Sequence, residues 1–180
     1  MNRVTLALLL CVAVPAVGTP ADPDAGPPNP AIDMKGYLQI SREAAAHRST
    51  RRLSVDEFLR MSKEPGTLVL DARSKDKYDL LHVNGAISLP FTDIAIESVK
   101  RVIPDKNTRV LIYCNNNFVN NERAFESKLP AASLNLSTYI ALYTYGYRNI
   151  YELGPRLDTN NSKLPLVSTP QAKPVKDAAR

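Results

Sequence analysis

The sequence predicts an α/β fold in which a central parallel sheet carries helices on both faces. Short apolar runs alternate with segments of helical periodicity between residues 51 and 157, and turn residues separate them. This alternation is typical of parallel sheets, because each parallel connection needs a crossover that is usually a helix. The runs are continuous rather than alternating, as expected for strands buried on both faces. Such a region, about 110 residues long, is large enough for one independent core.

The composition of the chain is typical of a globular protein and excludes several other classes. The chain has 180 residues, of which 44% are hydrophobic and 23% are charged, so we expect one domain with tails. A formal net charge of +5 is too mild and too mixed along the chain to indicate a nucleic-acid partner. Two cysteines are too few for a disulfide scaffold.

Residues 1–18 are predicted to be a secretory signal peptide. Arg3 supplies a positive start, and the apolar run from Val4 to Val17 is shorter than the roughly 20 residues of a membrane span. The small residues Ala16 and Gly18 favour cleavage after residue 18. We therefore expect a secreted or periplasmic protein with no stable membrane insertion. Cleavage would also remove Cys11.

Residues 19–66 are predicted to contain a linker, a helical extension and the first helix of the domain. Residues 19–36 are predicted to be a linker, because prolines recur there without apolar periodicity. An alanine-rich stretch within residues 37–50 favours a helical extension. The capping-box pattern of Ser54 and Glu57 starts the first helix of the domain, and the Pro65-Gly66 pair ends it.

The remaining elements follow from apolar runs and their terminating residues. An Asn84-Gly85 turn and Pro90 bound one short strand, and Gly146 ends the last long helix. Residues 158–180 are expected to form a tail outside the domain, disordered from about residue 168. The predicted strands cover residues 67–71, 86–89, 109–113 and 149–153, and the predicted helices cover 74–81, 93–102 and 134–145.

Cys114 follows directly after the strongest predicted strand. Ligands of open parallel sheets bind beyond the carboxyl ends of the strands. A cysteine in an apolar context is often a buried, inert side chain, but this position favours a functional site. After signal cleavage Cys114 would be the single cysteine of the chain.

Three motifs resemble the rhodanese (sulfurtransferase) family, and they occur in the family's order. The first comprises Leu70–Arg73, Lys77–Tyr78 and Leu81–Pro90, which is similar to the family's D-x-R … Y … G-H-I-x-G-A-x-N-x-P signature. The second is the strand Val110–Cys114, and the third is Tyr145–Leu153, which resembles a closing G-Y-x-N-V-Y-x-L motif. The resemblance implies a rhodanese-like domain over residues 51–157, with Cys114 as the catalytic nucleophile.

The loop after Cys114 departs from the family pattern. It is rich in asparagine, lacks glycine and has its first cation at Arg123, and an extra segment of residues 122–133 follows it. The asparagines either present amide donors to the sulfur or form a polar surface loop, and both interpretations stay open here. The residues expected to bind the substrate are Asn115, Asn116, Asn117, Phe118, Val119, Asn120 and Arg123.

Other polar residues are assigned structural roles. Asp71, Arg73 and His82 are expected to brace the loops rather than react. No metal site and no cofactor are expected, because His47, His82 and Cys114 lack ligand spacing.

Two functions remain as hypotheses. The first is a sulfurtransferase or sulfane-sulfur carrier that forms a persulfide on Cys114, with a thiosulfate-type anion as donor and a thiophilic acceptor such as a thiol. The second is a non-catalytic rhodanese module that binds a protein partner or a small anion. A phosphatase is disfavoured, because Tyr113 stands where a histidine is needed and Asn120 where a phosphate-binding arginine is needed.

Overall fold

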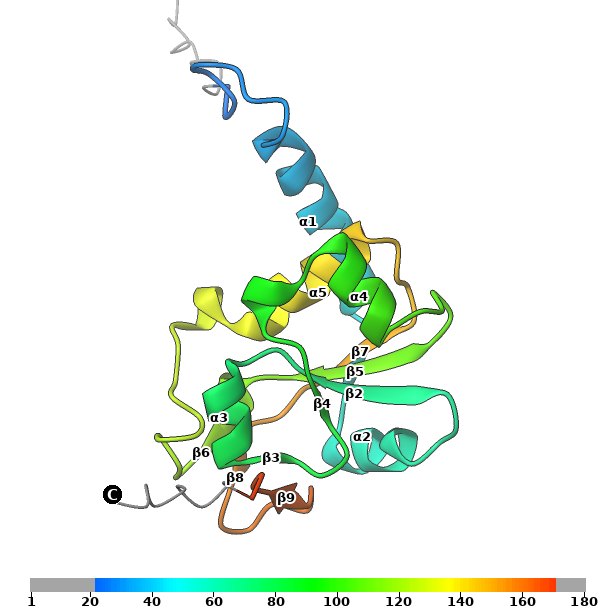
Figure 1. The fold of residues 1–180 in the computed structure, drawn as a ribbon, viewed down its shortest axis with the longest axis vertical. Helices are drawn as coiled ribbons and strands as arrows, with labels where there is room; N and C mark the ends of the chain where they lie inside the picture. Colours follow the sequence, from blue (N-terminus) through cyan, green and yellow to red (C-terminus); the bar gives the residue numbers. More distant parts are fainter. Residues whose placement is uncertain (1–21, 171–180) are drawn as a thin grey trace, which may run out of the picture.

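A five-stranded, all-parallel sheet forms the centre of the protein in the computed structural model, which describes residues 22–170 (Figure 1). The proposed signal peptide lies outside the described residues. The strand order is β1-β7-β5-β2-β4, and every neighbouring pair is parallel. The strands are β1 (Arg52–Leu53), β2 (Thr67–Asp71), β4 (Ile87–Ser88), β5 (Arg109–Tyr113) and β7 (Ile150–Leu153). The predicted α/β class with a parallel sheet is confirmed.

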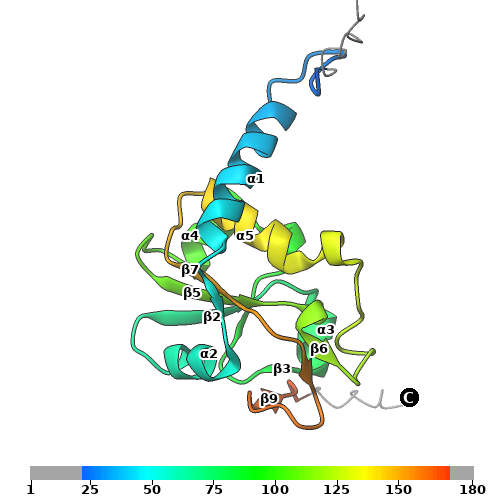
Figure 2. The same cartoon turned by 180° about the vertical axis from the view of Figure 1, so that it is seen from behind.

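Helices cover both faces of the sheet (Figure 2). The α-helices are α1 (Met34–Arg48), α2 (Val55–Ser62), α3 (Lys75–Leu80), α4 (Ile96–Val102) and α5 (Leu134–Thr144), and the 3₁₀ helices are η1 (Phe91–Asp93), η2 (Asn115–Asn117) and η3 (Pro130–Ala132). Two small sheets pair β3 (His82–Val83) with β9 (Leu166–Val167) and β6 (Phe118–Val119) with β8 (Leu157–Asp158). Within residues 22–170, every helix is too short or too polar to cross a membrane.

Alternation along the strands divides the core into two layers. On β5, Leu111 and Tyr113 pack with the α2 side of the core, whereas Val110 and Ile112 pack with α1, α4 and α5. Successive strand residues point to opposite faces, so a strand between two helical layers must be apolar throughout. This explains the continuous apolar runs of the sequence.

The capping box predicted for α2 is present. The Ser54 hydroxyl accepts a hydrogen bond from the Glu57 N–H at 3.3 Å, and the Glu57 carboxylate accepts one from the Ser54 N–H at 2.9 Å. Two backbone donors that the helix itself leaves unpaired are thereby satisfied.

The N-terminal extension is joined to the domain by a buried carboxylate. Its helix α1 begins at Met34, inside the expected linker, because the Asp33 side chain caps it. Glu152 on β7 is 1% exposed and accepts hydrogen bonds from Arg48 Nε at 2.8 Å and Arg52 Nε at 3.0 Å. A buried carboxylate is tolerated only when paired. The carboxyl-terminal half of α1 therefore belongs to the folded domain, while its other half projects away from it (Figure 1).

The predicted domain end at residue 157 is corrected. The chain continues through β8 and β9, and Leu164 is 1% exposed within the core layer under the sheet. Ser168 and Thr169 still bond to the chain, through the carbonyls of Leu80 and Asp79. Elements of two residues carry no periodic signal, so the sequence could not reveal them.

Candidate functional site

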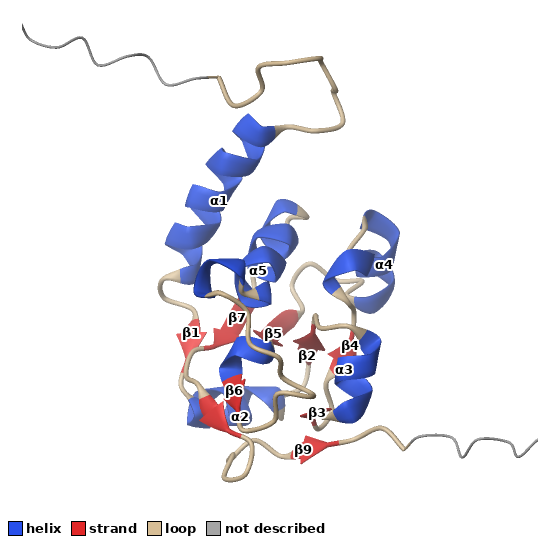
Figure 3. Cartoon of the chain, turned by 90° about the vertical axis from the view of Figure 1, so that its left-hand side faces the viewer, coloured by secondary structure: helices blue, strands red, loops and turns tan. Residues whose placement is uncertain are grey.

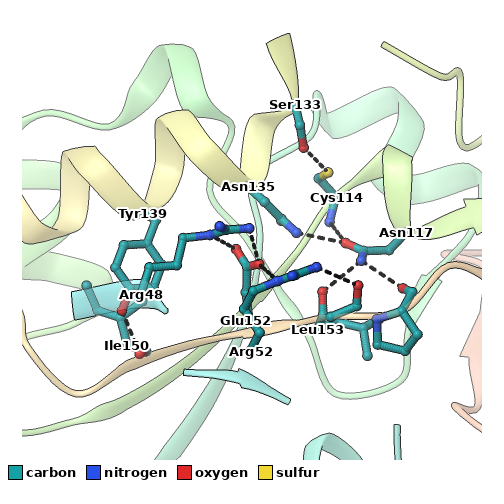
Figure 4. A network of polar contacts seen from close by, with 12 residues as sticks. Arg48, Arg52, Cys114, Asn117, Ser133, Asn135, Tyr139, Ile150, Glu152 and Leu153 are labelled. Carbon is teal, nitrogen blue, oxygen red and sulfur yellow. Dashed lines mark hydrogen bonds and ion pairs between the residues drawn. The ribbon is translucent and has the colours of Figure 1, made fainter. Parts of the chain in front are cut away.

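Cys114 lies at the carboxyl end of β5 and is fully buried, with 0% of its surface exposed. Its backbone N–H donates to Asn117 Oδ1 at 2.9 Å, and its Sγ lies 3.3 Å from Ser133 Oγ (Figure 4). Ser133 immediately precedes α5. The thiol therefore sits between the end of a central strand and the start of a helix that packs on the sheet.

Residues 114–118, which we call the thiol loop, contain the 3₁₀ helix η2 directly after Cys114. The Asn117 N–H donates to the Cys114 carbonyl at 3.1 Å, and the Phe118 N–H donates to the Asn115 carbonyl. These donors are used inside the turn. They bond to backbone carbonyl oxygens rather than to the sulfur.

Two of the asparagines hold the extra segment in place. Asn115 Nδ2 donates to the Glu126 carbonyl, and Asn116 both donates to the Lys128 carbonyl and accepts from the Lys128 N–H, each at 2.9 Å. We call residues 126–133 the cover segment, because it runs from these two contacts to Ser133 at the sulfur. Its residues 129–132 are exposed.

The third asparagine fixes the loop to the sheet. Asn117 Nδ2 donates to the Leu153 carbonyl at 2.8 Å and to the Pro155 carbonyl at 3.1 Å. Asn135 Nδ2 on α5 donates to Asn117 Oδ1 at 3.0 Å. The side-chain amides of Asn115, Asn116 and Asn117 therefore donate to backbone carbonyls and hold the loop, rather than donating to the sulfur. The interpretation as a polar surface loop fits Asn120, which is exposed.

The other predicted substrate-binding residues have different surroundings. Phe118 is fully buried, with its ring centre 4.4 Å from that of Phe125, so it belongs to the core. Val119 pairs with Asp158 across β6 and β8, and Asn120 has a φ of 65°, a left-handed turn that asparagine tolerates. Arg123 is exposed. Of the predicted set, Asn115, Asn116 and Asn117 are the residues that hydrogen-bond to Cys114 or to the cover segment.

Asp71 and Arg73 form a buried ion pair beside the site, at 0% and 2% exposure. Arg73 also donates to the carbonyls of Ala124 and Leu81, both at 2.7 Å. The Tyr113 hydroxyl donates to Asp71 and accepts from the Val83 N–H at 3.0 Å. We call Asp71, Arg73 and Tyr113 the brace. Burial, reinforced by the Asp71 carboxylate, raises the pKa of Tyr113 well above its usual range, so its phenol stays protonated.

His82 lies outside the thiol site. Its ring stacks on that of Tyr78 with centres 3.7 Å apart, and its Nδ1 lies 2.7 Å from the Tyr78 carbonyl. Both contacts join α3 to β3, which is a structural arrangement.

An open pocket of about 340 Å³ adjoins the site at the carboxyl edge of the sheet. Its lining includes Asn115, which follows Cys114 in the chain, and Leu134, which follows Ser133. Lys77 and Lys128 supply positive charge. Lys77 also lies 3.5 Å from the Glu126 carboxylate, which lines the same pocket. Cys114 itself does not line the pocket.

Sequence reasoning did not identify Ser133, Asn135, Lys77 or Lys128 as site residues. Ser133 and Lys128 lie in the extra segment, whose path nothing in the sequence reveals. Lys77 lies on α3 and Asn135 on α5. A serine before a predicted helix is a recognisable signal, but it indicates a helix cap rather than a thiol partner.

The site contains polar atoms whose hydrogen bonding is incomplete. Among the described residues, the buried Oδ1 atoms of Asn115 and Asn135 and the buried Oγ1 of Thr138 have no hydrogen-bond partner. Such atoms are rare in folded proteins.

Comparison with protein-family models matches residues 54–153 to the Rhodanese-like domain, which is more than half of the chain. The chain belongs to the rhodanese-like domain family. The matched region contains four of the five strands of the central sheet, together with Cys114 and the brace. The family predicted from the three sequence motifs is therefore confirmed.

Individual relatives of this rhodanese-like domain are distant. Thiosulfate sulfurtransferase PspE of Escherichia coli (strain K12) is 39% identical over 46 residues, which are 26% of this chain and 43% of that protein. The match thus spans less than half the length of this curated relative. A solved structure of rhodanese with anions from E. coli has 24% identity and a TM-score of 0.39, covering 57% of this chain and 98% of that one. The rhodanese-like domain of Alr3790 from Anabaena sp has 16% identity and a TM-score of 0.47, covering 72% and 92%.

Proposed function

We propose that this rhodanese-like protein is a sulfurtransferase or sulfane-sulfur carrier that forms a persulfide on Cys114. The position of the thiol carries the proposal. Within the region that defines the family, Cys114 follows the central strand β5 and contacts the residue that starts α5. The carboxyl edge of a parallel sheet is where ligands bind, and a helix N-terminus favours an anion such as a thiolate.

The reaction needs a single nucleophile. The Cys114 thiolate attacks the outer sulfur of a thiosulfate-type donor, so that a new S–S bond forms while the donor's own S–S bond breaks. Sulfite leaves with the electron pair of the broken bond, and the cysteine retains the transferred sulfur as a persulfide anion. Attack on the outer persulfide sulfur by a thiophilic acceptor, such as cyanide or a thiolate, then regenerates the Cys114 thiolate.

The adjoining pocket supports an anionic donor. Lys77 and Lys128 line this pocket. Asn115, the residue directly after Cys114, lines it as well. The sulfur is fully buried, so a donor reaches it only after neighbouring residues move. The cover segment is the natural element to move, because its residues 129–132 are exposed and its hold on the thiol loop consists of a few side-chain bonds.

Mass spectrometry tests the proposal directly. We expect thiosulfate to add the mass of one sulfur to the peptide that contains Cys114, and cyanide then to remove it as thiocyanate. The Cys114→Ser variant is the control and should show neither change. Absence of both the increment and the thiocyanate in a folded wild-type protein would reject the persulfide mechanism.

A non-catalytic module is the alternative, and the burial of Cys114 favours it. The loop amides are committed to structural bonds, so a preformed sulfur pocket is not their role. Such a module would bind a small anion or a protein partner without forming a covalent bond to sulfur. Thiosulfate binding that persists unchanged in Cys114→Ser, with no mass increment in the wild type, would favour this alternative.

We also propose that residues 1–18 direct export to the periplasm or the extracellular space. The support is the apolar run flanked by Arg3 and by small residues. Fractionation of cells that express the full chain tests this, since export should produce a shorter mature protein outside the cytoplasm. Retention of the full-length chain in the cytoplasm would contradict it.

A further inference from the structure

Ser133 occupies a position where a serine normally caps a helix. It is the N-cap of the 11-residue helix α5, yet its side chain makes no capping hydrogen bond. Ser54, at the same position of α2, does cap its helix. The Ser133 hydroxyl instead lies 3.3 Å from the sulfur of Cys114. The helix thus forgoes a stabilising bond, and the hydroxyl is directed to the thiol.

Three backbone donors and three side-chain amides of the loop bond to oxygen atoms rather than to the sulfur. The backbone N–H groups of Cys114, Asn117 and Phe118 donate within the loop. The side-chain amides of residues 115–117 donate to carbonyls of the cover segment and of the chain after β7. Within residues 22–170, Ser133 is the residue whose side chain hydrogen-bonds to the sulfur.

We propose that Ser133 is a catalytic residue that donates a hydrogen bond to the Cys114 sulfur in its anionic form. This inference rests on the proposed persulfide function. A neutral thiol can donate to the hydroxyl, but a thiolate can only accept, so ionisation turns the hydroxyl into the donor. Hydrogen bonds to a charged acceptor are the stronger kind. The bond remains on Sγ while the outer sulfur is gained and lost, and no proton is transferred.

The test compares Ser133→Ala with Ser133→Thr in the full chain carrying Cys11→Ser. The readout is the pH dependence of alkylation of Cys114 by iodoacetamide, followed by mass spectrometry. Loss of the hydroxyl in Ser133→Ala should move the midpoint of the pH–rate profile upward by about one pH unit, since the variant no longer supplies a donor to the charged form of the sulfur. Ser133→Thr keeps the hydroxyl and should restore the original midpoint. Thermal unfolding of each variant verifies that it is folded.

Two outcomes would overturn this role. In one, Ser133→Ala leaves the midpoint unchanged. In the other, alanine and threonine shift it equally, which would indicate packing rather than a hydrogen bond. Alkylation needs no sulfur donor, so the result is independent of persulfide formation. A shift of the midpoint in Ser133→Ala without persulfide formation in the wild type would reject the proposed function but not the Ser133–thiol bond. Persulfide formation in the wild type without a shift of the midpoint would reject the Ser133–thiol bond but not the proposed function.

Discussion

The brace and the thiol loop lie at the ends of neighbouring strands, yet they treat their polar groups differently. The strands β2 and β5 lie side by side in the sheet (Figure 3). Asp71 ends β2 and pairs in register with Tyr113, which ends β5. In the brace, the carboxylate, the guanidinium and the phenol are all bonded to one another or to backbone carbonyls. One residue beyond the end of β5, the buried Cys114 thiol has one side-chain hydrogen-bond partner. Asn115 Oδ1 has no hydrogen-bond partner among the described residues.

This difference distinguishes a saturated network from an incompletely bonded one. A saturated network in a low-dielectric interior is rigid, and removing one member leaves a buried charge unpaired. An incompletely bonded site costs stability but keeps groups free for a ligand. We therefore expect substitutions in the brace to change stability, and substitutions around the thiol to change reactivity.

The largest effect is expected for Arg73→Ala. It leaves the buried Asp71 carboxylate without its cation, and we expect the free energy of unfolding to fall by about 3–5 kcal/mol. Urea denaturation measures this. The matched control is Arg60→Ala, which removes an exposed ion pair with Glu64 and should cost less than about 1 kcal/mol. Similar losses in both variants would contradict the assignment of the brace.

Asn117→Ala should have the next largest effect. Asn117 is the member of the thiol loop that is bonded as thoroughly as the brace, with contacts to Cys114, to Asn135 and to the carbonyls of Leu153, which ends β7, and Pro155. Loss of a buried polar partner costs about 1–3 kcal/mol. Urea denaturation is again the measurement, and a loss no larger than that of Arg60→Ala would show that these contacts do not hold the loop.

The two N-cap serines give a smaller and sharper contrast. Ser54→Ala should lower the free energy of unfolding by about 1 kcal/mol, because it removes a real cap. Ser133→Ala removes no cap and should leave stability nearly unchanged. Thermal unfolding of the two variants under identical conditions measures this difference in stability. An equal loss in both would mean that Ser133 caps α5 after all.

The smallest effect on stability is expected for Asn116→Ala, but its effect on the thiol should be clear. The substitution removes two bonds that hold the cover segment at Lys128. If opening becomes easier by about 1 kcal/mol, alkylation of Cys114 should accelerate about fivefold at constant pH. Asn160→Ala, at an exposed position, is the matched control. Equal alkylation rates in Asn116→Ala and Asn160→Ala would exclude the cover segment as the access route.

The sequence predicted the long elements of the fold more successfully than the short ones. The strands 67–71 and 109–113 and the capping box of α2 agree with the structure residue by residue. Their signals are local, because they consist of apolar runs, a capping pair and turn residues. The two-residue strands β3, β6, β8 and β9 were not predicted, since pairing with a distant partner defines them.

At the site, the sequence located the thiol but not its partners. The asparagine run indicated a polar loop, whereas its bonds to Glu126, Lys128 and Leu153 depend on where those carbonyls lie. Ser133 is 19 residues from Cys114 along the chain, and the cover segment between them has no periodic pattern.

The sequence alone therefore determined the α/β class, the family motifs and the position of Cys114 after β5, because each depends on residues close together in the chain. The tertiary structure alone decided that the thiol is buried, that the asparagines hold the loop and that a helix-capping serine contacts the sulfur. These features depend on side chains that only the packing of α5 and the cover segment against the sheet brings within hydrogen-bond distance.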